Sequence, residues 1–227
     1  MATVMITGAN RGIGLGLVTQ YLQQGFDVIA ACRDPNASSL QEITGAEHLR
    51  VVAMDVGDKQ SIAAAAKQLQ GQAIDLLINN AGIGGGKQQG LRDIDEDAWL
   101  RVLRINTLAP LFVTRAMLPN LSLAKAPKVM VISSQLGAIS YPNISLYAYE
   151  SSKAAVNKVV KGMAADLKEQ GIAVFAIHPG WVKTDMGSAN AAITVAQSTS
   201  GLVNTFGKLS LQNTGTFWQW NGTEHAW

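Results

Sequence analysis

The sequence predicts an α/β protein, a single domain over residues 1–227 in which helices cover both faces of a doubly wound parallel sheet. A short apolar, β-branched run, Thr3–Ile6, indicates a buried strand. Three closely spaced glycines follow it, and an apolar pattern with helical spacing starts at Ile13. Strand, glycine-rich turn and helix form the first unit of the Rossmann-type dinucleotide-binding fold. The length of 227 residues suits one such domain, and the hydrophobic fraction of 48% supports a large core.

The glycine-rich turn is suited to hold a pyrophosphate. The first turn of a helix has unpaired N–H groups and a positive dipole end, and both attract phosphate oxygens. Glycine lets the backbone turn sharply and approach those oxygens closely. The spacing here, Gly8-x-x-x-Gly12-x-Gly14, departs from the common Gly-x-Gly-x-x-Gly fingerprint. A glycine turn without a ligand is the alternative, which the flanking strand and helix disfavour.

The end of the second predicted strand, Asp27–Ala31, bears on the choice of cofactor. The segment Cys32–Pro35 ends this strand, because proline does not continue it. An acidic residue at this edge would hold the ribose 2′-hydroxyl of NAD, whereas arginine accommodates the 2′-phosphate of NADP. Arg33 stands at this edge and Arg11 in the glycine turn, so NADP is favoured over NAD. Asp34 is a competing signal, and both arginines could instead be solvated surface charges.

The rest of the chain alternates between strand and helix patterns. Further strands are predicted at Leu49–Met54, Asp75–Gly82 (with its turn), Lys128–Ser134 and Ile172–Ile177. Helices are predicted at Lys59–Leu69, at Asp95–Leu121 with a bend at Pro110, and from Tyr147 toward Asp166. The aromatic C-terminus, with Phe217, Trp218, Trp220 and Trp227, indicates packing or a subunit contact.

Tyr149 and Lys153 form a candidate acid–base pair. Residues four apart share a helix face, whereas Tyr147 lies six residues from Lys153 on a different face. A free phenol, with a pKa near ~10, is a poor acid at neutral pH, but a cation at ~4 Å is expected to lower that pKa by roughly one to three units. Tyr149 is therefore predicted to protonate a carbonyl during hydride transfer. The spacing alone also occurs by chance on many helices.

These motifs together resemble those of the short-chain dehydrogenase/reductase family. The resemblance extends from Thr3 to about Trp227 and is closest to the short members, which include sniffer-like carbonyl reductases and bacterial C-factor proteins. The motifs that carry it are Thr7-Gly8-x-x-x-Gly12-Ile13-Gly14, Asn79-Asn80-Ala81-Gly82, Tyr149-x-x-x-Lys153 and His178-Pro179-Gly180-Trp181-Val182-Lys183-Thr184.

The resemblance implies roles for individual residues. The catalytic set would be Asn106, Ser134, Tyr149 and Lys153, in which Ser134 holds the substrate oxygen and Asn106 completes a proton path with Lys153 through water. Residues 186–204 would form a substrate lid. The residues expected to bind the cofactor are Gly8, Asn10, Arg11, Gly12, Ile13, Gly14, Arg33, Asp55, Val56, Asn80, Ala81, Gly82, Tyr149, Lys153, Pro179, Gly180, Val182 and Thr184.

The function that the resemblance implies is NADPH-dependent reduction of a ketone or aldehyde to an alcohol. One alternative is a non-catalytic NADP-binding regulatory or signalling protein of the C-factor type. Another is a nucleic-acid or protein binding module without cofactor. Family resemblance also implies a homodimer or homotetramer that acts on a small-molecule carbonyl substrate.

Composition argues against several other classes of protein. The net charge of +2 and the lack of a basic cluster with interleaved aromatic residues disfavour nucleic-acid binding. No run of 18 apolar residues suggests a membrane span, and a single cysteine without a secretory signal favours the cytoplasm. No metal site is predicted, because His48, His178 and His225 lack metal-ligand spacing. His178, beside Pro179, could touch the substrate pocket, but it is interpreted as a structural histidine with its hydrogen bonds satisfied.

Overall fold

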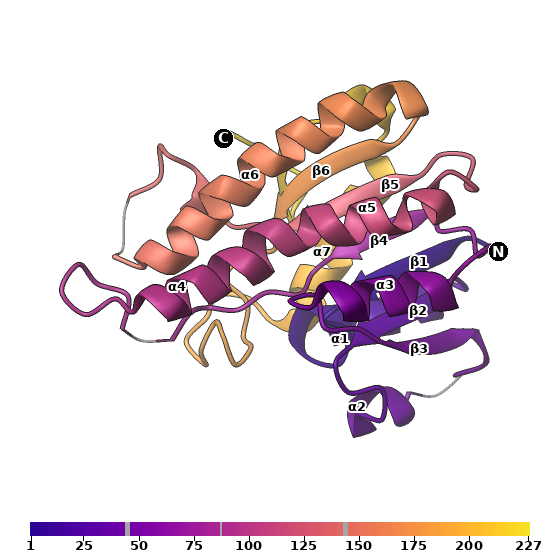
Figure 1. The fold of residues 1–227 in the computed structure, drawn as a ribbon, viewed down its shortest axis with the longest axis horizontal. Coiled ribbons are helices and arrows are strands. Elements are labelled where there is room, and N and C mark those ends of the chain that lie inside the picture. Colours follow the sequence, from indigo (N-terminus) through magenta and orange to yellow (C-terminus); the bar gives the residue numbers. More distant parts are fainter. Residues whose placement is uncertain (44–45, 87, 143–144) are drawn as a thin grey trace.

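The computed structural model, which describes residues 1–43, 46–86, 88–142 and 145–227, contains one eight-stranded sheet with helices on both faces (Figure 1). The strand order is β3-β2-β1-β4-β5-β6-β7-β8. Neighbouring strands run parallel except for β7 and β8, which pair in antiparallel fashion. The order reverses between β1 and β4, and such a switch point opens a crevice at the carboxyl ends of the strands. The predicted fold class is confirmed.

The elements follow the predicted alternation. The strands are β1 Thr3–Thr7, β2 Asp27–Cys32, β3 Leu49–Ala53, β4 Leu76–Asn79, β5 Lys128–Ile132, β6 Ala173–His178, β7 Phe217–Gln219 and β8 Glu224–His225. The α-helices are α1 Gly12–Gln23, α2 Ser38–Gln41, α3 Lys59–Gln68, α4 Glu96–Leu103, α5 Ala109–Leu121, α6 Tyr147–Leu167 and α7 Val195–Lys208. Short 3-10 turns lie at Ala46–His48, Gln135–Gly137, Lys168–Gln170 and Leu211–Asn213.

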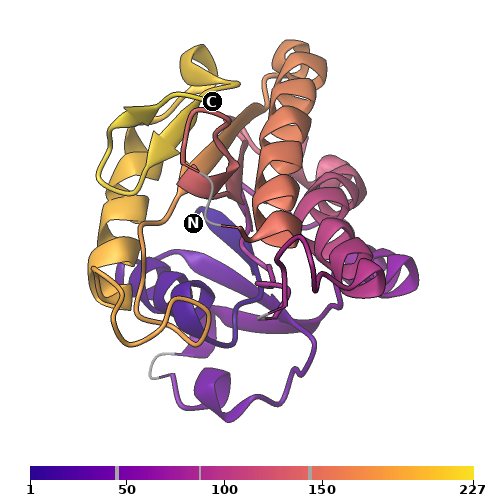
Figure 2. The same cartoon turned by 90° about the vertical axis from the view of Figure 1, so that its left-hand side faces the viewer.

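Two hydrophobic cores lie on the two faces of the sheet. Side chains alternate along each strand, so Met5 enters the core under α3, α5 and α6, whereas its neighbour Ile6 enters the core under α1 and α7. Figure 2 shows α6 and the α4–α5 pair on one side of the sheet and α1 and α7 on the other. Because both faces are covered, the strands are nearly continuous apolar runs, as is typical of parallel sheets.

The aromatic C-terminus packs within the molecule. Phe217 on β7 is fully buried, and its ring stacks on that of Trp227 with 5.4 Å between ring centres. Strands β7 and β8 are short and were not predicted, because three and two residues are too few for a period-two pattern to be recognised.

The helix that follows the fourth strand is interrupted near its middle. A bend was predicted at Pro110, but Pro110 lies in the first turn of α5, where proline is tolerated. The interruption comes just before it, as a five-residue π-helical turn, Arg104–Leu108. Such turns often occur at functional sites, and this one contains Asn106.

The region predicted as a substrate lid divides into two parts. Residues 195–204 belong to α7, which packs against α1. Its buried residues Leu202, Val203 and Phe206 join the core on that face of the sheet.

Within the described ranges, no helix combines the length and apolar character needed to cross a membrane.

The glycine turn offers a stability test. An added Cβ on Gly14 would lie 2.2 Å from the Gly8 carbonyl oxygen, so Gly14→Ala is expected to destabilise the fold by about 1–3 kcal/mol. Gly162, on the exposed side of α6, has open space around it, so Gly162→Ala is expected to stabilise by about 0.5–1 kcal/mol through lower backbone entropy in the unfolded chain. Urea unfolding of both variants measures these changes, and an unchanged midpoint for Gly14→Ala would contradict the close approach.

Candidate active site

A cavity of about 1150 Å³ opens at the carboxyl ends of β1, β2, β4, β5 and β6. Its volume is slightly above the range of roughly 300–1,000 Å³ for small-molecule sites, so it has room for a large ligand or for two. The structure brings together at its walls all of the residues predicted to act in catalysis or cofactor binding, except Gly14 and Asn106.

The glycine turn forms one wall of the cavity. Gly8 and Gly12 have φ angles of 64° and 52°, which side chains rarely adopt. Helix α1 starts after Arg11, whose side chain makes no capping hydrogen bond, so the first-turn N–H groups lack a side-chain partner. Gly14 was predicted to contact a cofactor but lies behind this wall, where its missing side chain lets α1 approach the Gly8 carbonyl.

Hydrogen bonds from the end of β4 hold the glycine turn in place. The Asn80 side-chain Nδ2 donates to the carbonyl oxygens of Thr7 and Gly8, at 2.9 and 3.2 Å. The backbone N–H groups of Asn80 and Ala81 both donate to the Thr7 hydroxyl. Buried Asn79 donates to the Thr114 hydroxyl on α5. These amides join β1, β4 and α5.

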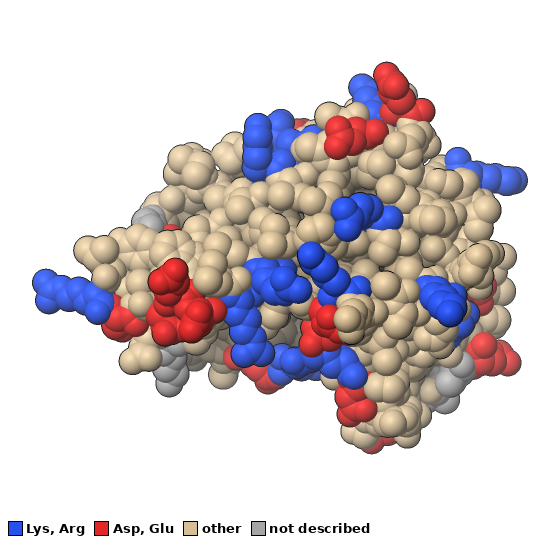
Figure 3. Space-filling view, viewed as in Figure 1, with Lys and Arg blue, Asp and Glu red and all other residues tan. Residues whose placement is uncertain are grey.

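Basic side chains border the cavity. Arg11 and Arg33 line it as predicted, and Arg101 on α4 lines it as well, although the sequence offered no signal for it. Arg11 Nη1 also lies 3.3 Å from Asp185 Oδ2, and both side chains are mostly exposed. Figure 3 shows basic side chains around a hollow between the positions of α4 and α3. The competing acid, Asp34, does not line the cavity.

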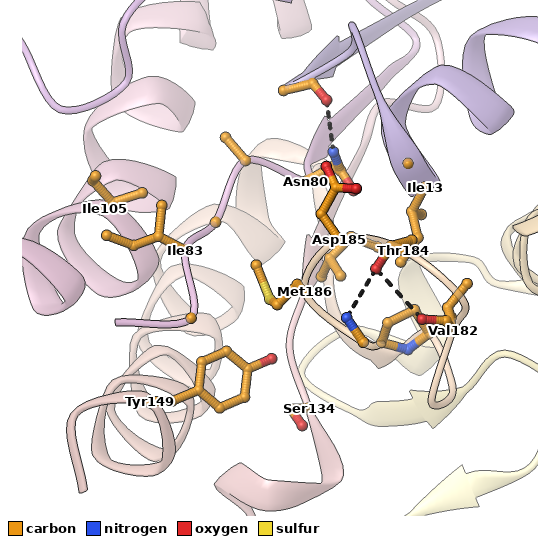
Figure 4. Close-up of a pocket in the computed structure, with 18 of the residues that line it drawn as sticks. Ile13, Asn80, Ile83, Ile105, Ser134, Tyr149, Val182, Thr184, Asp185 and Met186 are labelled. Carbon is orange, nitrogen blue, oxygen red and sulfur yellow. Dashed lines mark hydrogen bonds between the residues drawn. The ribbon is translucent and has the colours of Figure 1, made fainter. Parts of the chain in front are cut away.

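The segment after β6 forms the wall opposite the glycine turn. Thr184 faces that turn closely, since a Cβ added to Gly12 would lie 3.4 Å from its methyl group. The Thr184 hydroxyl donates to the Val182 carbonyl and accepts from the Gly187 N–H (Figure 4). Trp181 lines the cavity and is held by a bond from its indole N–H to the Gly187 carbonyl.

Tyr149 and Ser134 approach each other at one end of the cavity. The Tyr149 hydroxyl points toward the segment that carries Ser134, just after β5 (Figure 4). Lys153, one turn further along α6, is 5% exposed and donates from Nζ to the Ile132 carbonyl at 2.8 Å. Its Nζ lies 5.7 Å from the centre of the Tyr149 ring.

The pKa of the Tyr149 phenol shifts upward, which corrects the expectation that Lys153 lowers it. Desolvation raises this pKa, and hydrogen bonding with Ser134 opposes the rise. Burial lowers the pKa of Lys153 to about 8. The expected Coulomb effect left out desolvation, but both groups are removed from water, and the ammonium is engaged by the Ile132 carbonyl.

Asn106 lies beside the cavity rather than in its wall. Its Oδ1 accepts from the Ile83 N–H, and its Nδ2 donates to the Ile83 carbonyl and to the Ser152 hydroxyl. The side chain therefore ties the segment after β4 to α6, next to Lys153. The water-mediated path from Asn106 to Lys153 stays a prediction.

His178 differs from its interpretation as a satisfied structural histidine. It is 7% exposed at the end of β6, lines the cavity, and its Nδ1 has no hydrogen-bond partner among the described residues. Burial, followed by the positive charges of His225 and Lys153, lowers its pKa to about 4. Sequence reasoning missed this because the neighbours of a buried ring come from distant segments.

Comparison with known proteins agrees with this geometry. The profile of the family described as "short chain dehydrogenase" matches residues 2–193. The C-signal protein of Myxococcus xanthus is 38% identical over 155 residues, which cover 68% of this chain and 93% of that protein. The chain therefore belongs to the short-chain dehydrogenase/reductase family, a class of oxidoreductases.

Two solved structures are similar over the whole chain. The NADPH-bound carbonyl reductase from chicken fatty liver is 36% identical, with a TM-score of 0.91, over 100% of this chain and 99% of that one. The carbonyl reductase Sniffer of D. melanogaster is 32% identical, with a TM-score of 0.92, over 100% of both chains. Sniffer-like carbonyl reductases are thus structural neighbours, as the sequence motifs indicated.

The lowered pKa of His178 predicts acid sensitivity. Between its ordinary pKa of 6.5 and the folded value of about 4, the unfolded chain binds a proton that the folded chain does not, so stability falls as the pH falls through this window. The loss should total about 3 kcal/mol by pH 4. His178→Gln removes this titrating group. Between pH 7 and pH 4, the unfolding free energy of this variant should therefore decrease by about 3 kcal/mol less than that of the wild type. Urea titrations at both pH values test this, and equal decreases in the two proteins would contradict it.

Proposed function

We propose that this protein reduces the carbonyl group of a ketone or an aldehyde to an alcohol, with NADPH as the hydride donor. The observation that carries the proposal is the meeting of the Tyr149 hydroxyl and Ser134 in a cavity that also reaches an uncapped helix start. The carbonyl reductases among the similar structures, one of them with NADPH bound, support it.

The residues of the cavity suit a phosphate-rich dinucleotide. The uncapped N–H groups at the start of α1 favour a pyrophosphate, and Gly8 and Gly12 leave the turn free of side chains. Arg11 and Arg33 offer planar cations for the 2′-phosphate that distinguishes NADP from NAD. Other cavity residues proposed to contact the cofactor are Asn10, Ile13, Asp55, Val56, Asn80, Ala81, Gly82, Tyr149, Lys153, Pro179, Gly180, Val182 and Thr184.

Three side chains account for the proton chemistry. Bound NADPH supplies the hydride. The Ser134 hydroxyl and the Tyr149 phenol hold the carbonyl oxygen, and Tyr149 gives its proton to that oxygen as negative charge develops there. Lys153 is mostly protonated at neutral pH, because its pKa of about 8 lies above 7. Its ammonium stabilises the phenolate that the proton transfer leaves.

The surroundings of Tyr149 favour an apolar substrate. The side chains of Ile83, Leu136, Leu146, Trp181 and Met186 line the same cavity. Burying a charged substituent among them would cost free energy without a partner, so an uncharged carbonyl compound with apolar substituents fits best. We assign the lid role to residues 186–194, the part of the predicted lid that precedes α7.

A homodimer or homotetramer is part of the proposal. Leu100, Leu108 and Leu111 on the α4–α5 segment are 55%, 42% and 36% exposed. Neighbouring exposed leucines of this kind support self-association through this segment.

Replacement of the proton donor tests the mechanism. Tyr149→Phe removes the phenolic proton but keeps the ring, so kcat with NADPH across a panel of ketones and aldehydes should fall by about 10²- to 10⁴-fold. NADPH binding, measured by its fluorescence, should be retained. Tyr147→Phe, on the same helix, is the control and should keep wild-type rates. Wild-type rates in Tyr149→Phe would contradict the assignment of Tyr149 as donor.

Replacement of Arg33 tests the cofactor preference. Loss of one charge-assisted contact to the 2′-phosphate should raise the KM for NADPH roughly 10- to 100-fold, while the KM for NADH changes little. Arg50→Ala is the control, because Arg50 is an exposed arginine that does not line the cavity. If Arg33→Ala changed the KM for NADPH and the KM for NADH equally, Arg33 would not be the residue that contacts the 2′-phosphate.

A signalling role is the second candidate, favoured by the 38% sequence identity to the C-signal protein over 155 residues. In that case the chain would bind NADPH without reducing any member of the carbonyl panel. The intact Ser134, Tyr149 and Lys153 set argues for catalysis instead.

A further inference from the structure

Helix α6, which carries Tyr149, starts without a side-chain cap of its own. The residue before it, Leu146, cannot accept a hydrogen bond through its side chain. A helix start leaves its first N–H groups without partners inside the helix. Here Gln89, from the connection between β4 and α4, supplies two acceptors. Its backbone carbonyl accepts from Tyr147 N–H at 3.3 Å, and its side-chain Oε1 accepts from Tyr149 N–H at 3.0 Å.

The other end of the Gln89 amide holds a wall of the cavity. Its Nε2 donates to the carbonyl oxygens of Gly84 and Gly86, at 2.7 and 2.8 Å. Both glycines line the cavity, and Gly86 has a φ of 85°, which glycine adopts readily and other residues rarely do. Gln89 itself is 2% exposed, so its amide is shielded from water that would compete for these bonds.

Gln89 repeats, one turn earlier, the arrangement made by Asn106. Asn106 joins the backbone of Ile83 to Ser152 on α6, next to Lys153. Gln89 joins the next residues of the same wall to the backbone of Tyr149. Two buried amides therefore bridge the segment after β4 to successive turns of α6, one at the level of each proposed catalytic residue.

We propose that Gln89 is a positioning residue for the reduction: it sets the distance between the Gly84–Gly86 wall and Tyr149, and so the place of the phenol relative to a bound carbonyl. This inference rests on the proposed function. A buried amide suits the task because it offers one acceptor to the helix and two donors to the wall. A misplacement of about 1 Å in a reacting group can reduce a rate by about 10²-fold.

Two substitutions separate the two ends of the bridge. Gln89→Leu removes the side-chain acceptor and both donors, and should lower kcat roughly 10- to 100-fold while the KM for NADPH stays within about twofold. Gln89→Glu keeps the acceptor, but as a carboxylate it loses both donors and faces two carbonyl oxygens. Gln88→Leu, at the exposed neighbouring position, is the control and should retain wild-type kcat.

The pH profile of Gln89→Glu identifies positioning rather than a general loss of stability. Burial and the nearby carbonyl oxygens raise the pKa of such a carboxyl, and its protonated form regains one donor. The kcat of Gln89→Glu, divided by that of the wild type, should therefore rise several-fold as the pH is lowered from 8 to 6. A ratio independent of pH would contradict the bridge to Gly84 and Gly86.

Hydrogen exchange gives a readout that does not depend on turnover. The Tyr149 N–H has its partner outside the helix, so NMR should find it protected in the wild type and in Gln89→Glu, and exchanging at least tenfold faster in Gln89→Leu. Unchanged protection together with unchanged kcat in Gln89→Leu would overturn the inference. An inactive wild type with the expected exchange pattern would instead overturn the proposed function and leave the bridge supported.

Discussion

The packing of α6 against the end of β5 is the constraint on which the candidate site depends. A Cβ on Gly137 would lie 2.5 Å from the backbone carbon of Lys153, so the turn after β5 and the helix are in direct contact. Lys153 donates to the Ile132 carbonyl at the end of β5, and Asn157 donates to the Gly137 carbonyl. This close approach places a tyrosine and a lysine of the helix beside a serine of the strand end, although they are distant in sequence.

The same packing buries two ionisable side chains, which is electrostatically unfavourable. The ammonium of Lys153 and the ring of His178 are buried near each other, and burial lowers the pKa of both. A charge held away from water is destabilising unless it is well paired, and Lys153 has a carbonyl oxygen rather than a carboxylate as its partner. Sites that hold reactive groups in this way often trade stability for activity.

Around this contact, side-chain amides connect segments that are distant in the sequence. Asn80 holds the glycine turn, Asn106 holds Ile83, and Gln89 holds the next residues of the same segment. The amides of Asn106 and Gln89 bond through both their oxygen and their nitrogen, so a shift in one element is opposed by its neighbour. The π turn contains Asn106, whose side chain bonds to both Ile83 and Ser152 on α6.

The fold class and six of the seven parallel strands could be predicted from the sequence, because they depend on local apolar pattern and on the glycine turn. The site residues that the family motifs imply line the cavity, apart from Gly14 and Asn106. Apolar periodicity and the glycine turn specify β1 and α1 through short-range sterics. Tertiary structure alone decided that Gly14 supports the turn from behind, that Asn106 stands beside the cavity, and that the Tyr149 pKa rises. It also decided that Gln89 caps α6. These properties depend on desolvation and on partners up to 60 residues away, and no local pattern in the chain records them.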